Sequence, residues 1–253
     1  MNNIKVSKDS GLSSVLAGSL NALKHNPVLF FPKLVSTFLG ALWFVAVFDA
    51  VKTPETSLMI LPVILVSTVI LLFVGLSASV MVSSMVDLRE RYSGLALLKQ
   101  GAYATAGKVS DILVSVIGLV VFMIAVYMIA VLGFVAYYMT QRIVFLAAGL
   151  VISFILVIAS GFYLYFLPVS LFEKDSWKKA LRDSSSFSSE NSRDVSLMMV
   201  FSLTLLAPAF YFTGRLETVG YVGFIVSRIV SGLVNTYVFT LGPEYYLGSQ
   251  GLD

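Results

Sequence analysis

Residues 165–187 read YFLPVSLFEKDSWKKALRDSSSF, where an apolar run passes into a charged, serine-rich segment that keeps a helical spacing. The residues at i, i+3, i+4 and i+7 of this segment are Trp177, Ala180, Leu181 and Ser184. The basic residues beside them are Lys178, Lys179 and Arg182. Tryptophan next to an apolar face, with lysine and arginine on the polar face, is typical of a helix that lies on the membrane surface and binds anionic headgroups. The stretch therefore predicts an interfacial helix, with a plain cytoplasmic loop as the alternative.

The composition places the whole chain in the membrane class. Of its 253 residues, 58% are hydrophobic and 12% are charged, and the mean hydropathy is +0.91, whereas a soluble domain has about 45–50% apolar and 25% charged residues. The absence of cysteine excludes disulfides, thiol nucleophiles and thiolate metal sites. The isoelectric point of about 9.0 does not indicate a nucleic-acid partner, because the basic residues flank apolar runs as they do in membrane proteins.

Six apolar runs are long enough to cross the bilayer, which takes about 20 helical residues for roughly 30 Å of hydrocarbon. They cover residues 28–50, 58–85, 112–137, 142–171, 196–214 and 219–242. Short connections join the runs in pairs, and two long charged connections, near 87–111 and 173–195, separate the pairs. We therefore predict an all-α integral membrane fold of six transmembrane helices in three hairpins.

Lysine and arginine are distributed unevenly between the two sides of this arrangement. The N-terminal segment and the two long connections hold 13 of them, while the short turns hold Lys52, Arg142 and Arg215. Because cytoplasmic loops carry the excess of positive charge, we expect a multi-pass protein of the cell membrane with both termini in the cytoplasm. Lys33 belongs to the cytoplasmic group, since we expect its long side chain to reach the headgroups.

The hairpins show weak internal similarity at a spacing of 83 residues. A shift of this length aligns SGLSSVLAGSL (from Ser10) with SGLALLKQGAY, and a second shift reaches SWKKALRDSSS. We therefore predict three repeats, at about 10–92, 93–175 and 176–253, each led by a cytoplasmic amphipathic interfacial helix. In the first repeat the apolar face of that helix consists of Leu12, Val15, Leu16, Leu20 and Leu23.

The segment FLPVSLFEKDSWKKALRDSSSF resembles the cytoplasmic signature of a family of six-helix prokaryotic membrane proteins. This family includes the membrane domain fused to some glycerophosphodiester phosphodiesterases and many archaeal proteins. The residues that carry the resemblance are Pro168, at the close of the fourth span, Trp177, Ala180, Leu181 and Ser184. The stretch SLNALKHNPVLFF is similar to the family's lead into its first span. The resemblance implies a six-helix membrane fold and no reaction, because the 253 residues include no phosphodiesterase domain.

One charged residue lies deep inside a predicted span. Arg228 is about ten residues from either end of the sixth span, where an arginine is costly unless it is paired or reached by water. Ser231 and Asn235 follow at i+3 and i+7, so the three residues form one polar stripe. The stripe is either a candidate intramembrane site for an anionic ligand or pathway, or part of a structural clamp in which Arg228 binds backbone carbonyls or Asp49.

Small residues recur four positions apart in the even-numbered spans. They are Gly75, Ser79 and Ser83 in the second, Gly149 and Ser153 in the fourth, and Gly223, Ser227 and Ser231 in the sixth. Such spacing lets membrane helices approach closely. We therefore expect these faces to pack against other helices.

Enzyme signatures are absent from the sequence, which contains no glycine-rich phosphate loop, no HExxH and no embedded carboxylate pair with a histidine. We therefore expect a non-enzymatic membrane module, without a cofactor, that organises lipids or a partner. Its expected partners are membrane lipids, with a protein partner or further copies of the chain, and no nucleic acid. The alternative is a transporter or channel for a small anionic solute that uses Arg228.

Overall fold

The computed structural model describes residues 12–51 and 57–250, with side chains at 12–47 and 62–249. This part of the chain is helical and contains no strand. In chain order the elements are α1 (Leu12–His25), η1 (Pro27–Phe30), α2 (Phe31–Val51), α3 (Ser57–Leu88), α4 (Gly94–Ala106), α5 (Val109–Thr140), α6 (Ile143–Tyr163), α7 (Leu167–Glu173), α8 (Trp177–Glu190), α9 (Ser192–Glu217) and α10 (Tyr221–Gln250). The all-α class is confirmed for these residues.

Six stretches of the described chain are helical, long enough and apolar enough to cross a membrane. They are Pro27–Val47, Pro62–Leu88, Val109–Thr140, Ile143–Glu173, Ser192–Glu217 and Tyr221–Ser249. They overlap the six predicted spans in the same order. Many of their large apolar side chains are exposed, as expected for helices that lipid rather than protein surrounds. The prediction of six helices long and apolar enough to span a membrane is therefore confirmed, and these helices indicate a multi-pass membrane protein.

One span has an internal break and another has a later end than predicted, because of backbone geometry that apolarity alone does not show. The fourth span is not one helix, since α6 ends at Tyr163 and α7 begins at Leu167. Pro168 stands in the first turn of α7, where its missing N–H costs nothing, so it opens a short helix rather than closing the span. The sixth span was expected to end at 242, but α10 continues through Pro243 to Gln250.

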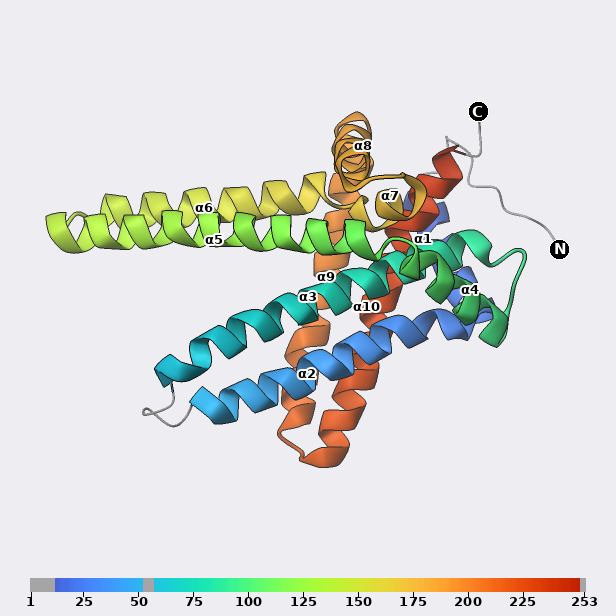
Figure 1. The fold of residues 1–253 in the computed structure, drawn as a ribbon, viewed down its shortest axis with the longest axis horizontal. Helices are drawn as coiled ribbons and strands as arrows, with labels where there is room; N and C mark the ends of the chain where they lie inside the picture. The colour runs from blue at the N-terminus through green and yellow to red at the C-terminus, as the bar shows by residue number, and fades with distance from the viewer. Residues whose placement is uncertain (1–11, 52–56, 251–253) are drawn as a thin grey trace.

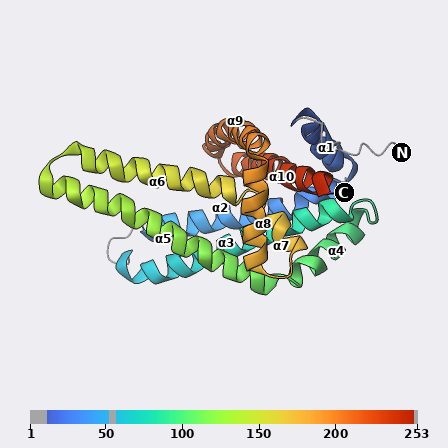
Figure 2. The ribbon, with the colours of Figure 1, turned by 90° about the horizontal axis from the view of Figure 1, so that it is seen from above.

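The long helices form three antiparallel pairs, and a short helix precedes each pair. α2 packs with α3, α5 with α6, and α9 with α10. α1 and η1 precede the first pair, α4 the second and α8 the third. Figures 1 and 2 show the three pairs diverging from one region of the molecule, where α1, α4, α7 and α8 gather.

We call this region the packed end; it consists of α1, α4, α7 and α8 with the adjoining ends of the long helices. Three clusters of buried apolar side chains lie there. In the first, Phe166, Phe187 of α8 and Tyr246 of α10 pack with ring centroids 4.7–5.9 Å apart. Aromatic rings at such distances bury large apolar areas. The packed end therefore has a protein core like that of a soluble domain.

An ion pair joins two distant parts of the chain at the packed end. Arg89, just beyond α3, binds Glu244 of α10 with both guanidinium Nη atoms, and the Nη2–Oε2 distance is 3.0 Å. Glu244 is only 5% exposed. Burial lowers the pKa of Arg89, while the carboxylates of Glu90 and Asp87 raise it, and an arginine stays protonated in any case. The pair therefore fixes the extension of α10 to the end of α3.

A second polar network connects α7, α8 and α10. Asp183 Oδ2 of α8 accepts hydrogen bonds from the Tyr246 hydroxyl at 2.5 Å and from Ser170 Oγ at 2.8 Å. Its Oδ1 lies 3.3 Å from Lys174 Nζ. Charge-assisted hydrogen bonds of this kind are stronger than those between neutral groups, so Asp183 orients all three helices.

α5 and α6 extend away from the packed end, and we call this pair the α5–α6 arm (Figure 1). Gly133 and Gly149 meet where the two helices cross, because a Cβ on Gly133 would lie 2.9 Å from the Gly149 Cα. Across the same interface Ser153 Oγ lies 3.2 Å from the Val126 carbonyl oxygen and donates to it. The small residues of the fourth span therefore pack against a neighbouring helix, as expected.

Two of the short helices bury faces that differ in part from those predicted. α1 buries Val15, Ser19, Ala22 and Leu23. α8 buries Ala180, Ser184 and Ser188. Leu20 and Leu181, both expected on the apolar faces, are exposed. The buried faces pack on other helices of the packed end, where small side chains allow close contact.

Candidate functional site

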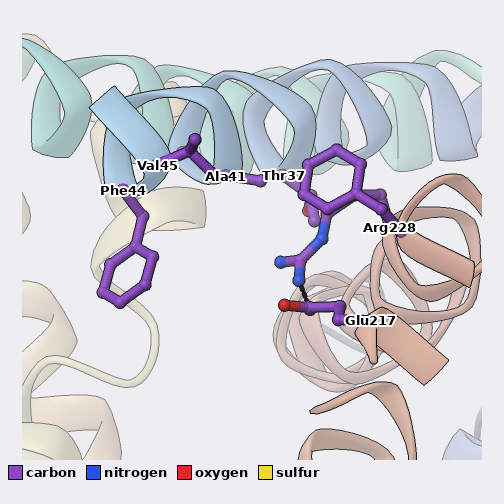
Figure 3. Close-up of a pocket in the computed structure, with 8 residues that line it drawn as sticks. Thr37, Ala41, Phe44, Val45, Glu217 and Arg228 are labelled. Atoms are coloured by element: carbon purple, nitrogen blue, oxygen red, sulfur yellow. Dashed lines mark ion pairs between the residues drawn. The ribbon is translucent and has the colours of Figure 1, made fainter. Parts of the chain in front are cut away.

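The Arg228 side chain extends from α10 toward the end of α9, beneath α2 (Figure 3). Its Nη2 forms an ion pair with Oε1 of Glu217, the last residue of α9. Ser227 Oγ lies 3.2 Å from the same carboxylate oxygen, within hydrogen-bond distance. The two charged side chains are 19% and 37% exposed, respectively. The intramembrane arginine therefore has a carboxylate partner, and together they carry no net charge.

The turn between α9 and α10 brings the two charges together. It passes through Gly220, whose φ of +87° favours glycine. Just beyond the turn, a Cβ on Gly223 would overlap the carbonyl oxygen of Leu216. Glycine at this position thus lets α10 begin close to the end of α9, so that Arg228 reaches back to Glu217.

A cavity of about 260 Å³ adjoins the ion pair, and we call it the α2–α10 cavity. Its lining residues are Thr37, Gly40, Ala41, Phe44, Val45, Glu217, Phe224 and Arg228. The Arg228 guanidinium lies 5.2 Å from the centre of the Phe224 ring. Its Nε is buried and has no hydrogen-bond partner among the described residues. The site can therefore offer one further N–H donor, although the charge of the guanidinium is already balanced.

The structure does not bring Ser231 and Asn235 to this cavity. They line a smaller, separate space with Leu206, Ala209, Phe210 and Val234, between α10 and α9. α10 packs on both α2 and α9. Around the axis of α10, Ser231 and Asn235 point in a slightly different direction from Arg228, so they face α9 instead of the α2–α10 cavity. The predicted polar stripe is therefore divided between two interfaces.

Glu217 is the residue of this site that the sequence prediction missed. It stands beside a turn, where a carboxylate is usually solvated, and was assigned to the connection between spans. The available signal was its place eleven residues before Arg228 across a tight turn. The clamp prediction for Arg228 named a different partner, Asp49, whose side chain lies outside the described residues.

Lys33 does not reach the headgroups, so that prediction is wrong. Its side chain is 5% exposed and lies between α2, α3 and α10. Nζ lies 2.5 Å from Ser79 Oγ and 3.4 Å from the carbonyl oxygen of Gly75. It also lies 3.5 Å from the centre of the Phe239 ring. The first turns of α2 are covered by α3 and α10, which keeps the amine away from the surface.

The predicted headgroup-binding residues lie on α8 and have two different environments. Lys178, Lys179 and Arg182 are exposed. Trp177 is half-buried against an apolar cluster of the packed end, and its backbone N–H donates to Asp111 Oδ1 at 2.9 Å. Lys178 Nζ lies 5.8 Å from the Trp177 ring centre, and Lys179 is 3.8 Å from the carboxylate of Asp175. The three basic residues are therefore presented together on a helix that the protein anchors.

Comparisons with known proteins add no information about this site. No family model, no curated protein and no solved structure matches the chain. The resemblance to the membrane domain fused to some glycerophosphodiester phosphodiesterases stays a prediction.

Proposed function

We propose that the protein is a non-enzymatic membrane module that organises anionic lipids at its packed end. The observation that carries this proposal is the arrangement of α8, which buries Ala180, Ser184 and Ser188 against protein and exposes three basic residues. These residues are Lys178, Lys179 and Arg182. A basic residue near an anionic surface gains about 1 kcal/mol. A rigidly held group of three can therefore select anionic headgroups without any movement of the helix.

The packed end is the cytoplasmic side in this proposal. The described basic residues of the long connections belong to α4, α8 and the adjoining segments, whereas Arg142 and Arg215 lie at the hairpin turns. Because cytoplasmic loops hold the excess of lysine and arginine, both termini are assigned to the cytoplasm. The burial of Lys33 removes one charge from this excess without reversing it.

Three structural repeats are part of the same proposal, and the burial pattern supports them. The buried residues of α4, which are Leu97, Gly101 and Thr105, align with the buried residues of α8 at the predicted spacing of 83. Buried positions 15, 19 and 23 of α1 align with those of α4 at a spacing of 82. Each repeat would then use one short helix to anchor the hairpin that follows it.

The test is lipid retention measured by native mass spectrometry. The protein is released from nanodiscs that contain equal amounts of phosphatidylglycerol and phosphatidylcholine, beside the variant K178Q/K179Q/R182Q. We expect wild type to retain phosphatidylglycerol and the variant to lose most of it, while the control R142Q/R215Q retains it. Equal retention by both variants would overturn the proposal, and a stoichiometric protein lost only from the α8 variant would identify a protein partner instead.

The alternative function, transport of a small anionic solute, is favoured by the α2–α10 cavity beside Arg228. The Glu217 partner opposes it, because the paired arginine has less attraction for an anion. The variants R228L and R228L/E217L separate the two roles. If Arg228 is a clamp, the double variant regains the stability that the single variant loses, since no charge is then left unpaired. A small anion bound to wild type and absent from the folded double variant would favour transport.

A further inference from the structure

Lys33 is a buried charge that neither function explains. Ser79 Oγ donates its own proton to the Gly75 carbonyl oxygen at 2.9 Å, so it accepts from the Lys33 amine. The two other neighbours of Nζ, the Gly75 carbonyl oxygen and the face of the Phe239 ring, also accept. An ammonium has three N–H donors and no acceptor. The surroundings therefore match the protonated form of the side chain, with one acceptor for each hydrogen.

No carboxylate forms an ion pair with Lys33 in the part of the chain that the structure describes. The nearest elements carry few charges. α3 has Asp87 in its last turn, η1 has none, and α10 has Arg228 and Glu244. The last two are already paired, with Glu217 and Arg89 respectively. Among the described side chains at the interface of α2, α3 and α10, the positive charge of Lys33 thus has no carboxylate partner, and the side chain of Asp49, on α2, lies outside the described residues.

An uncompensated ammonium in a membrane protein is costly, and it can be neutralised by an entering anion or by loss of a proton. Neither of the two cavities described above borders Lys33. An anion needs room beside the amine, whereas a proton does not. Proton loss is therefore the way of neutralising Lys33 that needs no such space.

Polar groups lie on both sides of Lys33 along the helices that surround it. Thr37, one helical turn further along α2, lines the α2–α10 cavity. In the other direction Ser83, one turn beyond the serine that binds the amine, is fully buried. Glu244 lies five residues beyond Phe239 on α10, at the packed end. Lys33 therefore stands between a cavity and a carboxylate that belongs to the packed end.

We propose that Lys33 is a proton-exchange site through which protons pass between the α2–α10 cavity and the packed end. The ammonium gives one proton to a water molecule at the packed end and becomes a neutral amine. The amine then takes a proton from a hydronium ion that enters from the cavity past Thr37. Only N–H and O–H bonds form and break, and no electrons are exchanged. The proposal does not rest on lipid binding by α8.

Proton flux into vesicles tests this proposal. The full chain is reconstituted into phosphatidylglycerol–phosphatidylcholine vesicles with a trapped pH-sensitive dye, and a potassium gradient with valinomycin sets the membrane potential. K33M replaces the unpaired charge by an apolar side chain of similar length, a change that membrane and core packing tolerate. We expect its flux to fall at least about tenfold, to the rate of protein-free vesicles, because a positioned proton carrier is lost.

Two further variants separate proton exchange from a fixed charge and from general damage. K33R keeps the charge but cannot release the proton, so we expect it to lose the flux as K33M does. The control K99M removes an exposed lysine of α4 that also lies near an aromatic ring, Tyr103, at 5.8 Å, and it should keep the wild-type rate. The proposal is overturned if wild type conducts no faster than protein-free vesicles, if folded K33M or K33R keeps the wild-type flux, or if K99M loses it. Where K33R does not fold, K33M decides.

Discussion

The packed end and the α5–α6 arm hold their helices together by different contacts. At the packed end, apolar side chains are buried in clusters, and polar contacts such as Arg89–Glu244 join residues far apart in the sequence. In the arm, two glycines and one serine make the close contacts. Large apolar side chains such as Phe154 and Met139 are exposed there.

The difference shows which region supplies its own apolar environment. Side chains of the packed end are removed from any solvent by other side chains, so their polar contacts lie in a medium of low dielectric constant, where leaving one unpaired is costly. The apolar surroundings of the arm are lipid tails. Lipid tails are as apolar as a leucine side chain, so apolar side chains gain little by packing against protein instead of lipid. Its two helices therefore depend on shape at their crossing. Substitutions at the packed end should therefore destabilise the fold by removing polar partners. Substitutions in the arm should destabilise it by disturbing the close contact between its two helices.

The largest effect should come from breaking the buried ion pair of the packed end. In E244Q, Arg89 keeps its charge and loses its carboxylate. Since removing one partner leaves an uncompensated buried charge, we expect the free energy of unfolding to fall by about 3 kcal/mol. Chemical unfolding in mixed micelles, followed by circular dichroism, measures the change. E90Q is the control, because Glu90 is exposed and its loss should change stability by less than about 0.5 kcal/mol. Equal effects of the two variants would contradict the comparison.

The arm should respond to a single added methyl group at its crossing. In G133A the new Cβ would meet the Gly149 Cα and the Phe145 carbonyl oxygen, each at 2.9 Å. We expect this variant to be about 2 kcal/mol less stable than G118A, because overpacking costs of this order accompany backbone shifts. Gly118 is the matched control on the same helix, since a Cβ there meets nothing within 4 Å. The same unfolding measurement applies, and G133A as stable as G118A would show that the arm does not depend on this contact.

At the packed end, Asp183 tests polar pairing of intermediate strength. D183N replaces the carboxylate that accepts hydrogen bonds from Tyr246 and Ser170 by a neutral amide of nearly the same shape. Hydrogen bonds to a charged group contribute about 1.5–3 kcal/mol, and the amide retains part of this, so we expect a loss of about 1.5 kcal/mol. D175N is the control, because the Asp175 side chain is 91% exposed and exposed pairs contribute little. A loss in D175N as large as in D183N would mean that net charge, and not the network, matters.

The sequence was sufficient for the six spans, because the length and apolarity of a run are local properties. It was also sufficient to mark Arg228 as a residue that needs a partner, since the cost of an intramembrane charge does not depend on the fold. The order of short and long helices follows from where the charged connections lie.

Features that depend on tertiary packing were not predictable in the same way. Lys33 stands near the end of a span, where a lysine usually reaches water, but Phe239, far away in the sequence, covers it. Ser231 and Asn235 share a face with Arg228 on an isolated helix, yet α10 has two neighbours that divide this face. The extension of α10 to Gln250 depends on partners such as Arg89. In each case the deciding contact comes from another part of the chain.

The smallest expected effect on stability is the difference between substitutions at two buried serines one turn apart on α8. Ser184 Oγ donates to the Tyr163 carbonyl oxygen at 2.8 Å, at the end of α6, whereas Ser188 Oγ is buried without a hydrogen-bond partner among the described residues. S184A leaves that carbonyl unsatisfied and should cost about 1 kcal/mol, whereas S188A removes an unsatisfied hydroxyl and should be neutral or stabilising. Parallel unfolding curves of the two variants measure the difference. Because both residues are buried on one face, their difference isolates the hydrogen bond that joins the base of the arm to the packed end. Equal stabilities would mean that packing alone holds the arm there.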